Sequence, residues 1–187
     1  MTAPQSAGRM HAADFPAWGV AGDKRRAHVG RVVALLHEWS GRMQLRSEEA
    51  VAWRDAGWFH DALRDADERT LRAMTGELYA PIGLLHGPAA ALRLEAHGEQ
   101  RLDVIEAVRW HTVGNANWTR TGKALYMADF LEPGRNFMQA DRAFLARLVT
   151  TAFDEVFRTV VRMRLEWALR EGKGLARETV ALWDAVR

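Results

Sequence analysis

Four histidines and two aspartates of this chain could together bind first-row transition metals, because imidazole nitrogen and carboxylate oxygen are common ligands of these ions. The chain has no cysteine, so a metal here would have to be held by nitrogen and oxygen donors without thiolate. The six candidates occur in the order His28, the adjacent pair His60 and Asp61, His86, His111 and Asp129. They therefore predict a metal site, provided that the fold brings them together.

Helical spacing directs the candidates inward. At about 100° per residue, His28 falls on the apolar face of its predicted helix. His111 continues one apolar stripe and Asp129 another, and a carboxylate on such a stripe is costly unless a cation or a donor meets it. His60 and Asp61 close an apolar run, and His86 begins a helix after two leucines.

The other three histidines have simpler explanations. His37 is predicted on the solvent side of its helix, His97 precedes the helix-ending Gly98, and His11 lies near the start of the chain. Any one inward histidine is more often a hydrogen-bonded core residue than a ligand. Six inward polar side chains in one core, however, would need many internal hydrogen-bond partners. Two divalent ions bridged by Asp61 would satisfy all six side chains at once.

The hydrophobic pattern is helical almost throughout, and no run of alternating β-branched residues indicates a strand. We therefore predict an all-α fold, a single helical bundle with a long C-terminal helix. The expected helices cover residues 24–39, 47–63, 68–75, 88–98, 102–112, 120–132 and 141–170, followed by a short last helix ending at Trp183.

The length of 187 residues fits one domain. We expect residues 1–22 to form a flexible lead-in and 23–187 the domain. A net charge of +2 with scattered basic residues argues against a nucleic-acid partner. No apolar run approaches the roughly 18–20 residues that cross a bilayer, and no signal-type segment is present, so we predict a cytoplasmic protein without a membrane partner. A homodimer through the 141–170 helix stays open.

The most specific motif covers residues 107–135, AVRWHTVGNANWTRTGKALYMADFLEPGR. With the upstream segments FHD at 59–61 and LLHGP at 84–88, and with Arg25 and His28 in an R-x-x-H opening, it resembles the HD-domain phosphohydrolases. The resemblance is closer to one branch, the YqeK-like symmetrical bis(5′-nucleosyl)-tetraphosphatases, which split diadenosine tetraphosphate into two ADP. It covers about residues 25–145.

This resemblance implies a metal-dependent hydrolase with two divalent ions, commonly iron, with Mn, Mg, Zn or Ni also open. One ion would be held by His28, His60, Asp61 and Asp129, and the other by the catalytic residues Asp61, His86 and His111. Substrate phosphates would contact Arg64, Thr112, Gly114, Lys123 and Arg135. The implied reaction is symmetrical cleavage of a dinucleoside polyphosphate by a metal-activated water.

Four departures from the family pattern leave the substrate open: Val29, Ala90, the loop 115–118, and Arg64 in place of lysine. One alternative is an HD phosphohydrolase acting on a mononucleotide, a cyclic nucleotide or an alarmone. A second is a nucleotide-binding helical module without turnover, and a third is a purely structural bundle. Apart from the family, Lys123 and Arg135 are interpreted as solvated surface residues.

Overall fold

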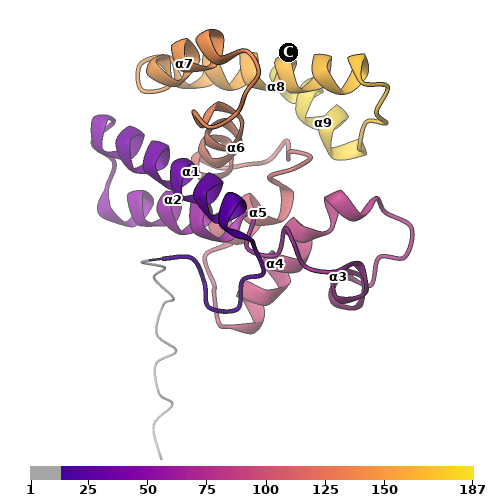
Figure 1. The fold of residues 1–187 in the computed structure, drawn as a ribbon. Coiled ribbons are helices and arrows are strands. Elements are labelled where there is room, and N and C mark those ends of the chain that lie inside the picture. Colours follow the sequence, from indigo (N-terminus) through magenta and orange to yellow (C-terminus); the bar gives the residue numbers. More distant parts are fainter. Residues whose placement is uncertain (1–13) are drawn as a thin grey trace, which may run out of the picture.

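The computed structural model describes residues 14–187, and this part of the chain contains helices and no strands (Figure 1). His11 and residues 1–13 of the expected lead-in lie outside it. The all-α prediction is confirmed for the described residues. None of the described helices combines the length and the apolar character needed to cross a bilayer. The elements are α1 Asp23–Arg42, α2 Ser47–Phe59, α3 Glu68–Thr75, the 3-10 turn η1 Ile82–Leu84, α4 His86–Ala96, α5 Leu102–Trp110, α6 Arg120–Leu131, α7 Gln139–Leu148, α8 Phe153–Arg170 and α9 Arg177–Val186.

The core forms where α1 and α2 pack side by side and where both meet α6, with α5 against α2 and α6 (Figure 1). Trp39 of α1 and Trp53 of α2 are completely buried. Helix α6 is buried along most of its length, which makes it the central helix of the bundle. Burial of apolar area on this scale is the main stabilising contribution to such a fold.

Several helix ends follow from local chemistry. Asp67 caps α3 by accepting a hydrogen bond from the Thr70 amide at 2.9 Å, and Gly76 ends this helix with a left-handed φ of 72°. Helix α4 ends at Ala96, and Gly98 just beyond it has a φ of 87°. The end of α3 lies where the sequence predicts it, whereas α4 begins and ends two residues before the predicted range 88–98.

The single helix predicted over residues 141–170 is wrong, because α7 ends at Leu148 and α8 begins at Phe153. Val149, Thr150 and Thr151 are consecutive β-branched residues, which fit a helix less well than straight-chain residues do. Val149 is completely buried, and the Thr151 hydroxyl donates to the Leu148 carbonyl. The break allows α7 and α8 to pack separately against α6.

Residues 14–22, the described part of the expected lead-in, contact the domain. The Trp18 ring stacks on Phe59 with centroids 6.1 Å apart. The Val20 amide donates to the Ala62 carbonyl at 2.7 Å, and the Asp65 amide donates to the Val20 carbonyl at 3.2 Å. This short ladder places the segment against the turn that follows α2, so the loose conformation expected for residues 1–22 does not describe 14–22.

Candidate metal centre

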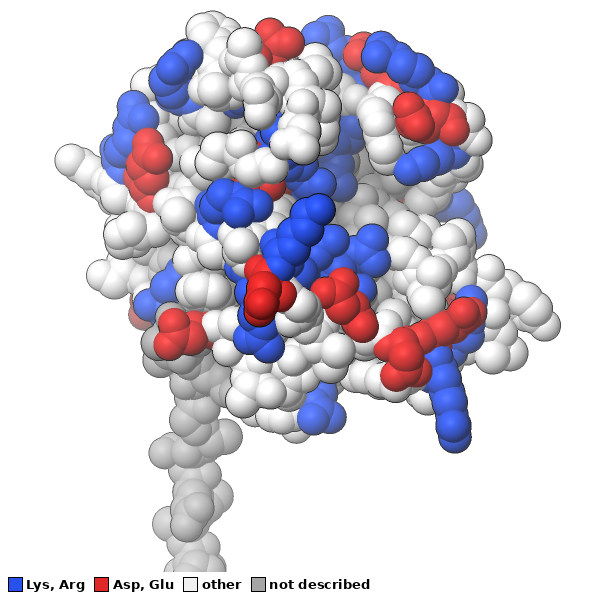
Figure 2. Space-filling view, viewed as in Figure 1, with Lys and Arg blue, Asp and Glu red and all other residues white. Residues whose placement is uncertain are grey.

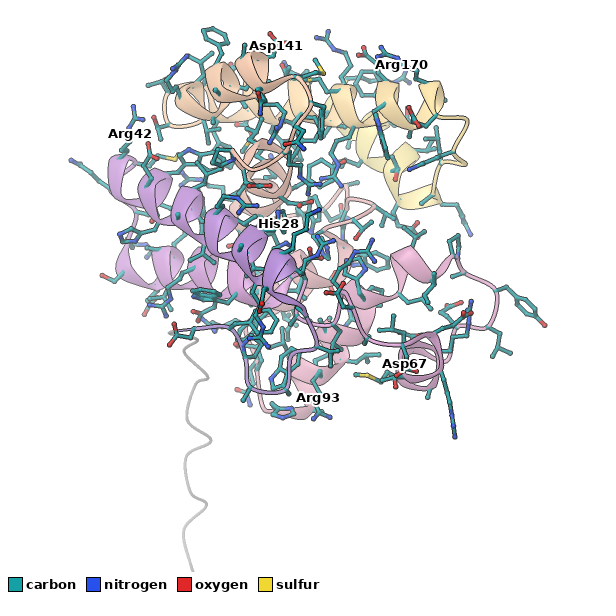
Figure 3. All side chains as sticks on the ribbon, in the orientation of Figure 1. His28, Arg42, Asp67, Arg93, Asp141 and Arg170 are labelled. Atoms are coloured by element: carbon teal, nitrogen blue, oxygen red, sulfur yellow. The ribbon has the colours of Figure 1, made fainter. Side chains whose placement is uncertain are left out.

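Five different elements supply the six candidate ligands. His28 lies on α1, His86 is the first residue of α4, and Asp129 lies on α6. His60 and Asp61 follow directly after α2, which ends at Phe59 and not at residue 63 as predicted. His111 caps the end of α5. In Figure 3, His28 lies near the middle of the molecule, whereas the labelled Arg42, at the far end of the same helix, lies at its edge.

The six side chains converge around Asp61, as predicted. Its Oδ2 atom lies 3.6 Å from Nε2 of both His28 and His60. Its Oδ1 atom lies 3.0 Å from His86 Nε2 and 3.5 Å from His111 Nε2. The two oxygens of one carboxylate thus face two separate histidine pairs, and the ligand atoms form two groups: His28, His60 and Asp61, and Asp61, His86 and His111.

Asp129 joins the first group from the opposite side. Its Oδ1 atom lies 3.2 Å from His28 Nε2, while His28 Nε2 and His60 Nε2 lie 3.4 Å apart. All six candidates are at least nine-tenths buried. The inward placement predicted for them is therefore observed, and His37 is exposed as expected.

Hydrogen bonds at the other ring nitrogen fix the tautomers of three of these histidines. The Nδ1 atoms of His60 and His111 each donate at 2.8 Å to a backbone carbonyl, of Gly57 and Val108. His28 Nδ1 donates to Glu132 Oε1 at 3.1 Å. A proton on Nδ1 leaves the lone pair on Nε2, so these rings present lone pairs to the centre. This is the usual outer-shell arrangement of metal-binding histidines.

The electrostatics favour ionised carboxylates, and neutral imidazoles at His60 and His86. At His28 burial opposes protonation, but hydrogen bonds to Asp129 and Glu132 prevail and raise the pKa of this ring. Complete burial lowers the pKa of His60 to about 4. Burial alone would raise the pKa of Asp61, but the surrounding His60, His111 and His86 hold it well below its usual value. Burial also opposes ionisation of Asp129, and there His28 and the charge of Arg135 prevail, so that this pKa too is well below its usual value.

This donor set fits divalent transition-metal ions. The Nε2 atoms of His86 and His111 lie only 3.0 Å apart, so with the proton of His86 on Nδ1 both would present lone pairs to one cation beside Asp61. His86 Nδ1 is buried and has no hydrogen-bond partner among the described residues, so His86 is the one ring whose tautomer the protein leaves free. Closed apolar packing would give none of these features.

A cavity of about 420 Å³ opens onto the centre and is lined by Asp61, His86, His111 and Asp129. Three of the five predicted phosphate contacts also line it: Arg64, Thr112 and Arg135. The Thr112 hydroxyl lies 3.2 Å from His111 Nε2. Figure 2 shows Lys and Arg side chains gathered at the middle of the face in view.

Gly114 and Lys123 do not line this cavity. Lys123 Nζ pairs with Asp154 at 3.1 Å and lies over the Phe157 ring, so that it connects α6 to α8. Gly114 has a φ of 93°, and a Cβ there would lie 2.4 Å from a methyl group of Leu182. The structure thus gives both residues packing positions, in contrast to their predicted contact with phosphate.

Three residues of the site were not among the predicted ones. Arg25 Nη1 donates to Asp61 Oδ2 at 2.7 Å, and its spacing of three residues from His28 places both on one helix face. Glu132 orients His28, and it stands in the motif of residues 107–135, three residues after Asp129, without having been predicted as a site residue. Arg164 on α8 lies 3.3 Å from Asp129 Oδ2 and donates to the Thr112 carbonyl at 3.1 Å, and no local pattern indicated it.

The comparisons with known proteins agree with this geometry. The fold matches a solved structure from Clostridium acetobutylicum described as a predicted HD superfamily hydrolase involved in NAD metabolism. Its TM-score is 0.75 and its sequence 25% identical, over 88% of this chain and 89% of that one. The chain is therefore similar in fold and in sequence to a solved HD superfamily hydrolase. No protein-family model matches it.

Three curated relatives of this chain are each named symmetrical bis(5′-nucleosyl)-tetraphosphatase. The Bacillus subtilis protein is 24% identical over 170 residues, which cover 87% of this chain and 89% of that protein. The Halalkalibacterium halodurans protein is 33% identical over 90 residues, or 44% and 48%, and the Staphylococcus aureus protein is 37% identical over 59 residues, or 31% and 30%. The matches to the latter two thus span about half of the relative's length or less.

Proposed function

We propose that this protein is an HD hydrolase that cleaves a nucleoside polyphosphate, and that its substrate is diadenosine tetraphosphate, split symmetrically into two ADP. The observation that carries the proposal is the placement of four imidazole Nε2 atoms around the two oxygens of Asp61. The names of the three relatives support the choice of substrate.

The two ligand groups would each hold one divalent ion, with Asp61 shared between them. When bound, such ions act as Lewis acids toward phosphoryl oxygens and lower the pKa of water. We propose iron, with Mn, Mg, Zn and Ni as alternatives that the donor types also accept. His28, His60 and Asp129 would complete the first group, and His86 and His111 the second.

The cationic side chains of the cavity would bind the polyphosphate and hold it in line. Arg25, Arg64, Arg135, Arg164 and Lys173 all line the same cavity. A phosphoryl transfer depends mainly on position and on fixed positive charge, because negative charge is spread over several oxygens. Arg164 has a second task, since it holds Asp129 and the Thr112 carbonyl in place from α8.

The test is hydrolysis of diadenosine tetraphosphate by metal-free protein reloaded with Fe(II) or Mn(II), followed by chromatography of the products. We expect the wild-type protein to yield ADP as the sole product. Asp61→Asn should remove activity and both ions, and His60→Ala should remove activity and reduce the bound metal. The matched control His37→Ala, an exposed histidine on α1, should change neither. Equal metal content in the three variants would refute the site assignment.

A second candidate is hydrolysis of another nucleotide, and the description of the C. acetobutylicum structure adds NAD metabolism to the choices. The assay therefore includes ATP, a cyclic nucleotide, an alarmone and NAD beside diadenosine tetraphosphate. Brisk turnover of one of these, with none of diadenosine tetraphosphate, would select this candidate. A cytoplasmic location and a homodimer remain predictions of the sequence.

A further inference from the structure

A second cavity, of about 470 Å³, also opens onto the candidate metal centre, and two arginines separate it from the first cavity. Arg25 and Arg135 line both cavities. Each of them also holds a ligand carboxylate, Arg25 on Asp61 at 2.7 Å and Arg135 on Asp129 at 2.5 Å. The pair therefore stands at the boundary between the two cavities and directly against the ligand cluster.

The two cavities reach the cluster at different histidines. His86 and His111, from the second ligand group, line the first cavity together with the shared Asp61 and with Asp129 of the first group. His28, from the first ligand group, lines the second cavity. Asp61 belongs to both groups, so a chain of phosphates lying along the cluster would have one end directed to each cavity.

The lining of the second cavity suits a phosphorylated nucleoside. Lys24 and Arg31 add two cationic groups to the shared arginines. Of its two acids, Glu132 already accepts hydrogen bonds from Arg31 and from the Gly134 amide, and Asp65 accepts from the Gly22 amide.

An aromatic ring is exposed in each cavity. Phe137 lines the second cavity and is 42% exposed, and Trp167 lines the first and is 49% exposed. Exposed rings beside cationic groups are the usual means of holding a nucleobase, because a base stacks on the ring while its phosphates meet the cations. Neither ring belongs to the buried core cluster: Phe137 contacts Phe130 and Arg142, and Lys173 Nζ lies 3.9 Å from the centre of the Trp167 ring.

We propose that the second cavity holds the second nucleoside of a dinucleoside polyphosphate, whose base stacks on Phe137, while the first nucleoside occupies the cavity of Trp167. This inference rests on the proposed function and adds to it a physical reason for symmetrical cleavage. A substrate with a nucleoside fixed in each cavity has its middle phosphates placed over the ligand cluster, and a cut there yields two equal halves.

The experiment compares two substrates that differ by one adenosine: diadenosine tetraphosphate and adenosine 5′-tetraphosphate. Phe137→Leu removes the stacking surface but keeps apolar bulk, and Phe137→Tyr keeps both. For Phe137→Leu we expect KM for diadenosine tetraphosphate to rise about tenfold, as loss of one stacked base does elsewhere. Phe137→Tyr should stay near the unchanged protein. The matched control is Phe144→Leu, an exposed phenylalanine on α7 that lines neither cavity.

Adenosine 5′-tetraphosphate gives the sharper contrast. Its single adenosine fits either cavity, so losing one of the two productive modes raises its KM by no more than about twofold. Trp167→Leu should show the same pattern as Phe137→Leu. Only the double variant, with both substitutions, should have a strongly raised KM for adenosine 5′-tetraphosphate. An equal effect of Phe137→Leu on both substrates, or no effect on either, would overturn the proposal.

Binding separates this inference from the function on which it rests. Calorimetric titration with a non-hydrolysable, methylene-bridged diadenosine tetraphosphate needs no turnover. We expect about tenfold weaker binding to Phe137→Leu and unchanged binding to Phe144→Leu. If the unchanged protein binds the analogue in this pattern but hydrolyses neither substrate, the proposed function fails and the second cavity stands. If Phe137→Leu binds as tightly as the unchanged protein, the second cavity is refuted, whatever the activity.

Discussion

Glu132 provides a selective means of weakening one half of the metal centre. Its Oε1 accepts from His28 Nδ1 at 3.1 Å, and its Oε2 accepts from Arg31 at 2.5 Å and from the Gly134 amide at 2.7 Å. Both oxygens are thus acceptors that face donors. The residue is only 1% exposed, so water could replace a lost partner only from the second cavity, which Glu132 lines.

Glu132→Gln keeps the shape but places an NH₂ group against a donor in either orientation. Turned toward His28, it removes the acceptor that keeps the proton on Nδ1. Turned the other way, it meets Arg31 and the Gly134 amide. A hydrogen bond to a charged group contributes about 1.5–3 kcal/mol, which corresponds to roughly 10- to 150-fold in affinity. Outer-shell partners of metal ligands typically account for about 10- to 100-fold. We therefore expect one ion to bind about 10- to 100-fold more weakly.

The weakened ion should be the one held by His28, because His86 and His111 make no contact with Glu132. Metal-free protein would be titrated with Mn(II), with free and bound ion followed by electron paramagnetic resonance. We expect two tight ions in the unchanged protein, and one tight and one weak ion in Glu132→Gln. The matched control Glu38→Gln, an exposed glutamate on α1 paired with Arg42, should bind like the unchanged protein. Equal weakening of both ions, or none, would refute this reasoning.

Three further outcomes can be measured on the same protein. Lys123→Ala should leave kcat unchanged and alter the free energy of unfolding by no more than about 0.5 kcal/mol. The reason is that Lys123 pairs with the exposed Asp154, and such surface ion pairs contribute little to stability. A large loss of kcat would show instead that Lys123 contacts the substrate. Gly114→Ala should destabilise by about 1–3 kcal/mol in urea unfolding, because it combines a positive φ with a clash against Leu182; an unchanged midpoint would contradict this. Partners of Glu132 lower its pKa from 4.5 to about 2, although burial opposes them, so the stability that it adds to the metal-free protein is complete above pH 4.5 and is lost as the pH falls toward 2. Urea unfolding at a series of pH values should therefore show a smaller acid-induced loss of stability for Glu132→Gln, and identical slopes would exclude this contribution.

The inward face of a helix could be predicted from sequence, and with it much of the metal centre. His28 and Asp129 lie on apolar stripes whose period fixes their direction, and both are buried as expected. The termination of α3 at Gly76 is equally local, because a left-handed residue suits glycine. Such features depend on a few neighbouring residues and need no knowledge of the rest of the fold.

Features that depend on contacts between distant segments could not be predicted. Arg164 reaches Asp129 only because the chain breaks after Leu148 and α8 packs across α6, and the periodicity of residues 141–170 reads as one uninterrupted helix. Lys123 fits the family motif at its position, yet its contact with Asp154 depends on the same placement of α8. The two cavities likewise result from packing, and no motif marks their boundary.

The ladder between residues 20 and 65 affects where this domain can be cut. Val20 bonds to Ala62 and Asp65, and Gly22 bonds to the Asp65 carboxylate, so the strip brackets the turn that carries His60 and Asp61. A version of the protein trimmed to residue 23, where the first helix starts, would lose these hydrogen bonds to the turn. The shortest unit that keeps the turn of His60 and Asp61 braced therefore begins ahead of α1, at about Phe15, whose ring centre lies 4.2 Å from the Arg26 guanidinium carbon.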